Sequence, residues 1–301
     1  MMSFMPELGF DIWTEELVPP HLRGDNRPVR RSRPLGEIIG LCNIRSKQST
    51  CEQGDRPVLN NLDLSIRRGE ILGIVGRSAI ERACLLRTIN LLERPRAGEI
   101  VYAHEAVQHF ESERLYSFRR KIGVLFREFG FLTFHSISHN LTLPMRLARW
   151  NSNEISRQAA ALLALVHLEG KSNHAVESLS ADEQSRLAIA RAIALKPEVL
   201  LCEDPGLVLS PAGTERFLEL VRLVNRRFGT TVVFSSDTSD AAAAVCDRLA
   251  TVSDGKIQGE STFMLRTGSE CRYESTVRSM NEHRSKRHLA THMQPVSLVQ
   301  R

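Results

Sequence analysis

The chain has 301 residues, of which 42% are hydrophobic and 25% are charged, ordinary values for a globular protein with a large core. This composition excludes collagen, a coiled coil and wholesale disorder, and no apolar run approaches the ~18 residues of a membrane span. Glu7 and Asp11 with no early basic residue argue against a secretory signal. Most of the +5 net charge lies in residues 261–301, which hold seven basic and three acidic side chains. The rest of the chain is nearly neutral, so nucleic acid is not expected as a partner.

Six cysteines are present, and no two of them have the Cys-x-x-Cys spacing of a zinc or redox site. Several lie in apolar runs, for example Cys202 at the end of Val199-Leu-Leu. This pattern predicts reduced thiols in the core of a cytoplasmic protein.

The predicted elements fall into three parts. Residues 1–36 are rich in proline and arginine and are predicted to be a disordered arm, and residues 261–301 are predicted to be a basic disordered tail. Between them, residues 37–260 form the predicted domain. Its predicted strands cover residues 38–44, 58–66, 70–76, 121–126, 198–203 and 230–236, followed by a hairpin over 249–258. Its predicted helices cover residues 84–92, 154–167, 180–195, 213–228 and 239–248.

Strands that alternate with helices predict an α/β fold with a mostly parallel sheet. Ligands of such sheets bind at the carboxyl ends of the strands. Function is therefore expected in the loops that follow Val75, Phe126, Cys202 and Ser235.

Five stretches of this domain, in this order, resemble the nucleotide-binding subunit of an ABC transporter, most closely the importer subfamily of methionine transporter ATPases. The stretches are residues 58–76, 86–100, 119–126, 186–193 and 197–202. The resemblance implies a RecA-like P-loop core with a mixed sheet and a helical subdomain near residues 130–185. It also implies ATP and Mg²⁺ as cofactors. The implied partners are a membrane permease and a second ABC ATPase subunit, identical or different, in the cytoplasm or at the inner face of the membrane.

The first loop departs from the family pattern G-x-x-x-x-G-K-[ST]. The loop reads Gly76-Arg-Ser-Ala-Ile-Glu-Arg-Ala-Cys84. Gly76 remains, but Glu81 replaces the second glycine and adds a carboxylate where an anion should bind. Arg82 replaces the lysine, and Ala83 replaces the hydroxyl that holds Mg²⁺. Ser78, Arg82 and the helix N-terminus remain attractive to phosphate.

The signature motif and the loop before it depart as well. Gln48 stands near the position of the adenine-stacking aromatic, and Arg127 replaces the glutamine that contacts the γ-phosphate. The signature L-S-G-G-Q reads Leu179-Ser-Ala-Asp-Glu183, which keeps Ser180 but has Ala181 and Asp182 at the glycine positions. The following S-A-L-D segment reads Leu207-Val-Leu-Ser210.

Three acidic positions complete the implied site. Glu203 occupies the position of the magnesium ligand, and Asp204 occupies that of the catalytic base, so the two carboxylates have exchanged lengths. Asp237 replaces the switch histidine. An error of about 1 Å in the position of a catalytic group can cost on the order of 100-fold in rate.

Every nucleotide-contacting loop departs from the pattern, while the framework between the loops follows it. We therefore expect an ABC ATP-binding-subunit homologue, amino-acid or methionine-like, that is deficient in ATP hydrolysis and weak in nucleotide binding. Two alternatives stay open: a working ATP-hydrolysing importer subunit that tolerates the substitutions, and a soluble regulatory or scaffold protein with the ABC fold. Residues 129–145 are expected either to receive a coupling helix of the permease or to pack in the core.

Overall fold

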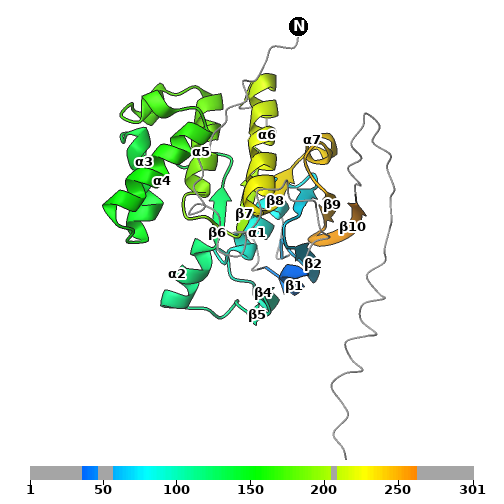
Figure 1. Ribbon diagram of the computed structural model, residues 1–301. Coiled ribbons are helices and arrows are strands. Elements are labelled where there is room, and N and C mark those ends of the chain that lie inside the picture. The colour runs from blue at the N-terminus through cyan, green and yellow to red at the C-terminus, as the bar shows by residue number, and fades with distance from the viewer. Residues whose placement is uncertain (1–35, 47–56, 205–208, 263–301) are drawn as a thin grey trace, which may run out of the picture.

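The computed structural model describes residues 36–46, 57–204 and 209–262 (Figure 1). The predicted tail beyond Thr262, most of the predicted arm, and Gln48 lie outside the described residues. Among the described helices, none has the length and apolar character needed to cross a membrane.

A six-stranded sheet organises the domain in the order β10-β9-β3-β8-β7-β6. Its strands are β3 (Ile71–Val75), β6 (Ile122–Leu125), β7 (Val199–Glu203), β8 (Thr231–Ser236), β9 (Arg248–Ser253) and β10 (Lys256–Thr262). All neighbours are parallel except β9 and β10, which form the predicted hairpin. The prediction of a mostly parallel sheet is confirmed.

A second, antiparallel sheet has the order β2-β1-β4-β5. Its strands are β1 (Glu37–Arg45), β2 (Leu62–Arg67), β4 (Ala97–Tyr102) and β5 (Glu105–Ala106). Strand β2 begins at Leu62, later than the predicted residue 58. Sequence reasoning missed β4, because only Ile100 and Tyr102 of this strand are buried and its apolar pattern is short.

Two apolar clusters lie on opposite faces of the parallel sheet. Strand β3 is buried throughout, and because side chains alternate along a strand, Ile71 and Val75 join one cluster while Leu72 and Ile74 join the other. A continuous apolar run is typical of a parallel strand that is covered on both faces. The sheet therefore holds its loops on a rigid, fully packed layer.

Helices cover both faces of this sheet. Residues of α1 (Ala79–Ile89) and α2 (Ser112–Arg120) join the cluster of Leu72. The other cluster includes residues of α3 (Ile137–Leu147), α4 (Ser152–Leu165), α5 (Ala181–Ala192), α6 (Pro211–Phe228) and α7 (Ser239–Ala243). In Figure 1 the green helices α3 and α4 gather on the opposite side of the molecule from β10.

Local signals explain the helix boundaries. Asn151 and Glu154 form a capping box at the start of α4. Ser210 caps α6, Pro211 is its first residue, and Gly229 ends it in the left-handed conformation at φ +64°. Helix α7 stops at Ala243 and not at the predicted residue 248, because β9 already begins at Arg248. Helix α2 was missed because Phe118 is its only fully buried residue.

Candidate functional site

The carboxyl ends of four adjacent strands bring the candidate loops together. Strands β3, β8, β7 and β6 are neighbours, and their pairing aligns Val75 with Ser236 and Glu203 with Ser235. The loops that follow β3, β6, β7 and β8 therefore meet at one edge of the sheet, as predicted.

The loop after β3 is shorter than the family pattern implies. Helix α1 begins at Ala79 and not at the predicted Cys84, and Ser78 is its N-cap. The Oγ of Ser78 accepts a hydrogen bond from the Glu81 amide at 3.2 Å, and its carbonyl accepts one from the Arg82 amide at 3.2 Å. Because alanine, glutamate and arginine favour a helix more than glycine does, residues 79–83 form its first turns. The amides of residues 81 and 82 are thus used inside α1.

The side chain of Arg82 turns back onto the end of β3. Only 3% of this residue is exposed, and its Nη1 donates a hydrogen bond to the carbonyl oxygen of Gly76. Burial lowers the pKa of Arg82, and Arg127 acts in the same direction, whereas Asp237, Glu203 and Asp204 raise it. The guanidinium therefore sits in the field of all three candidate carboxylates.

Glu81 points in a direction that the sequence did not predict. Its Oε1 accepts a hydrogen bond from the Gly255 amide at 3.0 Å, in the turn of the β9–β10 hairpin. Gly255 has φ +72°, a conformation that favours glycine, and a Cβ there would overlap the backbone of residues 58–60. The carboxylate of Glu81 is thus engaged by the hairpin, which corrects the expectation that it points into the phosphate site.

Gly76 and Cys84 are fixed by packing. A Cβ on Gly76 would overlap the Val252 carbonyl, so only glycine fits there. Cys84 is buried, its Sγ lies 3.4 Å from Glu93 Oε2, and burial raises the pKa of its thiol to about 11. Ala83 is half-buried beside it. Cys84, the residue after the hydroxyl position, thus faces the apolar core.

The two acids after β7 bind neighbouring loops. Glu203 Oε2 accepts a hydrogen bond from the Arg127 amide at 3.0 Å, which ties the loop after β6 to β7. Asp204 Oδ2 accepts one from the Ser236 hydroxyl at 2.7 Å, and the Asp204 amide donates to the Ser235 carbonyl at 2.8 Å. Asp237, which follows Ser236, is exposed. The structure therefore brings Arg82, Arg127, Glu203, Asp204 and Asp237 together, as the resemblance implied.

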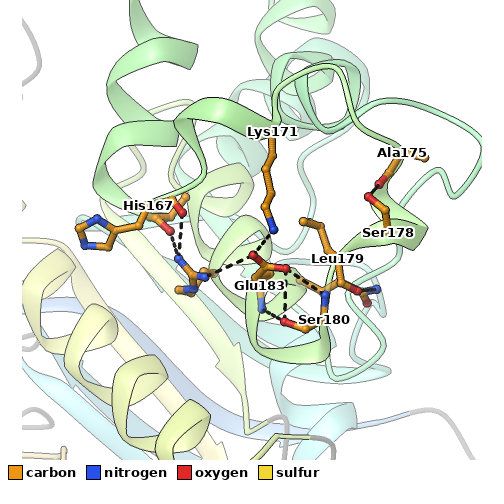
Figure 2. A network of polar contacts seen from close by, with 10 residues as sticks. His167, Lys171, Ala175, Ser178, Leu179, Ser180 and Glu183 are labelled. Atoms are coloured by element: carbon orange, nitrogen blue, oxygen red, sulfur yellow. Dashed lines mark hydrogen bonds and ion pairs between the residues drawn. The ribbon is translucent and has the colours of Figure 1, made fainter.

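The signature segment forms a separate network at the start of α5 (Figure 2). Ser180 and Glu183 form a capping box, in which each side chain bonds the other's backbone amide. Lys171 donates to Glu183 Oε1, and this hydrogen bond lowers the pKa of the Glu183 carboxyl. Arg186 donates to the carbonyls of Val166 and His167.

Asp182, in the first turn of α5, contacts a different helix. Its carboxylate accepts hydrogen bonds from the amide and the hydroxyl of Ser210, the N-cap of α6. Ala181 beside it is half-buried against the apolar core. The new carboxylate is thus engaged within the chain.

Four partner residues were missed by sequence reasoning: Lys171, Ser210, Ser236 and Gly255. Ser210 carried a signal, since a serine directly before Pro211 is typical of a helix start. The other three are distant in sequence from the residues they bind, so no local pattern could have found them.

The chain has clear relatives among known proteins. The ABC transporter family pattern matches residues 59–206. The chain is 36% identical over 220 residues to the methionine import ATP-binding protein MetN of Francisella tularensis, which covers 73% of this chain and 63% of that protein. It is 38% identical over 221 residues to MetN 2 of Rhodopseudomonas palustris, covering 73% and 59%. The chain thus spans about three fifths of the length of these relatives.

Among solved structures, the chain resembles the ATP-binding cassette MJ0796, described as a dimer in a post-hydrolysis state bound to ADP and Pi. The TM-score is 0.68 at 27% identity, over 75% of this chain and 98% of the cassette. The mixed α/β fold of this chain is therefore that of an ABC cassette. The chain therefore belongs to the ABC transporter ATP-binding family and has its RecA-like α/β fold.

Proposed function

We propose that this chain is an ATP-binding-subunit homologue of a methionine-type ABC importer that is deficient in ATP hydrolysis and binds nucleotide weakly. The family implies ATP and Mg²⁺ as ligands. The deficiency is inferred from the loops at the sheet edge, and the single observation that carries it is the engagement of the loop after β3 by its own chain.

That loop is a poor fit for Mg-ATP. A phosphate cradle needs free backbone amides, a cation that reaches the outer phosphates and a hydroxyl on Mg²⁺. Here the amides of Glu81 and Arg82 bond to Ser78, the Arg82 guanidinium bonds to Gly76, and Ala83 has no hydroxyl. Phosphate binding would have to break these contacts first, which supports weak affinity.

The acids support a deficiency in hydrolysis. Asp204, in the position of the base, is nearly buried and accepts the Ser236 hydroxyl. Glu203, in the position of the magnesium ligand, is engaged by the Arg127 amide. A general base must reach the proton it removes, and these contacts turn both carboxylates toward protein groups.

Steady-state ATP turnover tests this proposal. We expect the unaltered chain to stay well below ~1 s⁻¹, the lower end of ordinary enzyme turnover. Turnover above that value would contradict the proposal and favour a working importer subunit. A triple variant, Glu81→Gly, Arg82→Lys and Ala83→Ser, tests whether the first loop is the main cause of the low turnover. Ile80→Ala, in the same turn, is the matched control.

A membrane permease is the proposed partner. Four large apolar side chains near α2 and α3 are exposed, most of all Phe134 at 93% and Leu147 at 60%. The others are Tyr116 and Leu132, and the Tyr116 hydroxyl donates to the Leu147 carbonyl at 3.0 Å, so α2 and the end of α3 adjoin. Exposed apolar groups of this kind support docking of a helix from another protein. On this proposal the chain lies in the cytoplasm, at the inner face of the membrane when it is bound.

Co-purification with a permease subunit tests this partner, and we expect a permease gene to neighbour the gene of this chain. Phe134→Ser and Leu147→Ser are expected to reduce recovery, while Leu92→Ser, another exposed apolar position, is the control. A chain that never associates with membranes or a permease would favour the scaffold alternative. Assembly with a second copy, or with an active ABC ATPase subunit, is proposed from the dimeric cassette structure and is measured by light scattering.

A further inference from the structure

Gly213 is the third residue of α6, and its backbone conformation does not require glycine. Glycine weakens a helix relative to alanine, so its presence in the first turn needs another reason. A Cβ on Gly213 would overlap the carboxylate of Asp182. Asp182 thus lies directly over the backbone of α6, and the glycine makes room for it.

The carboxylate of Asp182 is held by two hydrogen bonds. Its Oδ2 accepts the Ser210 hydroxyl at 2.7 Å, and its Oδ1 accepts the Ser210 amide at 3.3 Å. The Ser210 Oγ in turn accepts the Gly213 amide at 3.0 Å. Asp182 belongs to the first turn of α5, so one carboxylate lies at the positive ends of two helices.

These residues depart from the family pattern together. The pattern implies a glycine at position 182 and an aspartate at position 210, whereas this chain has Asp182 and Ser210. Two carboxylates within hydrogen-bond distance would repel each other, and the exchange leaves one carboxylate facing a hydroxyl donor. The substitutions at 182 and 210 are therefore complementary in charge and in hydrogen bonding.

The rest of the signature turn is also closed on its own chain. The Ser180 hydroxyl accepts a hydrogen bond from the Glu183 amide, and Glu183 binds Lys171, which ends the 3₁₀ turn η3 (Glu169–Lys171) earlier in the chain. In the described part of the turn, Ser180, Asp182 and Glu183 all have partners within the chain.

We propose that Asp182, Ser210 and Gly213 form an internal latch, which closes the signature turn onto the N-terminus of α6. The latch is a conformational contact within one chain and needs no nucleotide. It does not rest on weak nucleotide binding at the first loop, because its groups lie in α5, in α6 and at the N-cap of α6.

A double-mutant cycle followed by thermal unfolding tests the latch. In the unaltered chain, Gly213→Ala is expected to lower Tm by several degrees, because the new methyl group displaces the Asp182 carboxylate. In the Asp182→Ala background the same change is expected to raise Tm by about 2–4 °C, the effect of a better helix former. Gly170→Ala is the matched control, since no atom lies within 4 Å of a Cβ built there, and it should shift both backgrounds alike.

Gly213→Ala with the same sign in both backgrounds would overturn the latch. If Asp182→Ala does not fold, amide hydrogen exchange on the unaltered chain decides. The Ser210 amide is expected to exchange about tenfold or more slowly than the Ala212 amide, because its acceptor is a carboxylate. Equal rates would overturn the proposal. Neither experiment contains nucleotide, so failure of the latch is distinguishable from failure of the proposed function.

Discussion

The parallel strands and the loops at their carboxyl ends are held by different kinds of contact. Strand β3 is buried throughout and is held by apolar contacts on both faces. In the loop that follows, Arg82 bonds to Gly76 and Glu81 bonds to Gly255. Both charged side chains of this loop therefore have partners within the chain. The strands are thus held by apolar packing, whereas the charged side chains of this loop are held by polar contacts within the chain.

Breaking the framework is expected to have the largest effect. Arg248 on β9 and Glu70 form a bidentate ion pair at 2.7 and 3.2 Å, with side chains only 3% and 5% exposed. Arg248→Met leaves the Glu70 carboxylate buried without its partner, which should cost about 3–5 kcal/mol of unfolding free energy in urea. The exposed pair of Arg114 and Glu105 is the control, and Arg114→Met should cost less than about 1 kcal/mol. Similar losses in the two variants would contradict the comparison.

The reactivity of Cys84 tests whether the residue that follows the first loop is buried like the strands or open to solvent. Burial disfavours the thiolate and raises the pKa of Cys84 to about 11, above the usual value of a thiol. At pH 8 the thiolate population is therefore about 100-fold lower than that of an unperturbed thiol. Alkylation by iodoacetamide followed by mass spectrometry should label the half-buried Cys42 well before Cys84. Labelling rates should rise as the pH approaches 11, and prompt labelling of Cys84 at pH 8 would place it in an open loop.

Restoring the family residues at positions 81–83 is expected to have a smaller effect, on the affinity for Mg-ATP. Glu81→Gly, Arg82→Lys and Ala83→Ser together remove the bonds to Gly255 and Gly76 and return a hydroxyl for Mg²⁺. We expect Mg-ATP to bind at least about tenfold more tightly, equivalent to about 1.4 kcal/mol, in a fluorescent-nucleotide titration. Unchanged affinity in the triple variant would mean that other loops set the defect.

The smallest expected effect is at the junction of α2 and α3. Tyr116→Phe removes the hydrogen bond to the Leu147 carbonyl but keeps the ring over which Arg120 lies. Because this bond is exposed, unfolding free energy should fall by no more than about 1 kcal/mol. A larger loss would show that this junction belongs to the framework.

Much of the fold could be predicted from the sequence, because buried parallel strands are short apolar runs. The runs at β3, β6, β7 and β8 predicted the sheet and hence the edge where the loops meet. Strand β4 and helix α2 were missed because few of their residues are buried. The start of α1 was misplaced because the family pattern implies a loop there, whereas Ser78 caps a helix at that point.

The candidate site was predictable in its members but not in its contacts. Glu203, Asp204 and Asp237 lie at the predicted strand ends, beside Arg82. The directions of Glu81 and Asp182 could not be predicted, since their partners Gly255 and Ser210 are 174 and 28 residues away in sequence. Such long-range hydrogen bonds depend on the packing of several elements at once.

Isothermal calorimetry of the unaltered chain with Mg-ATP tests the central claim most directly. If contacts within the chain engage Arg82 and Glu81 of the first loop, no saturable heat should appear below about millimolar ATP. Such a result corresponds to a binding free energy weaker than about −4 kcal/mol. A micromolar Kd, about −8 kcal/mol, would contradict the account, because the contacts of Arg82 and Glu81 would then yield readily to nucleotide.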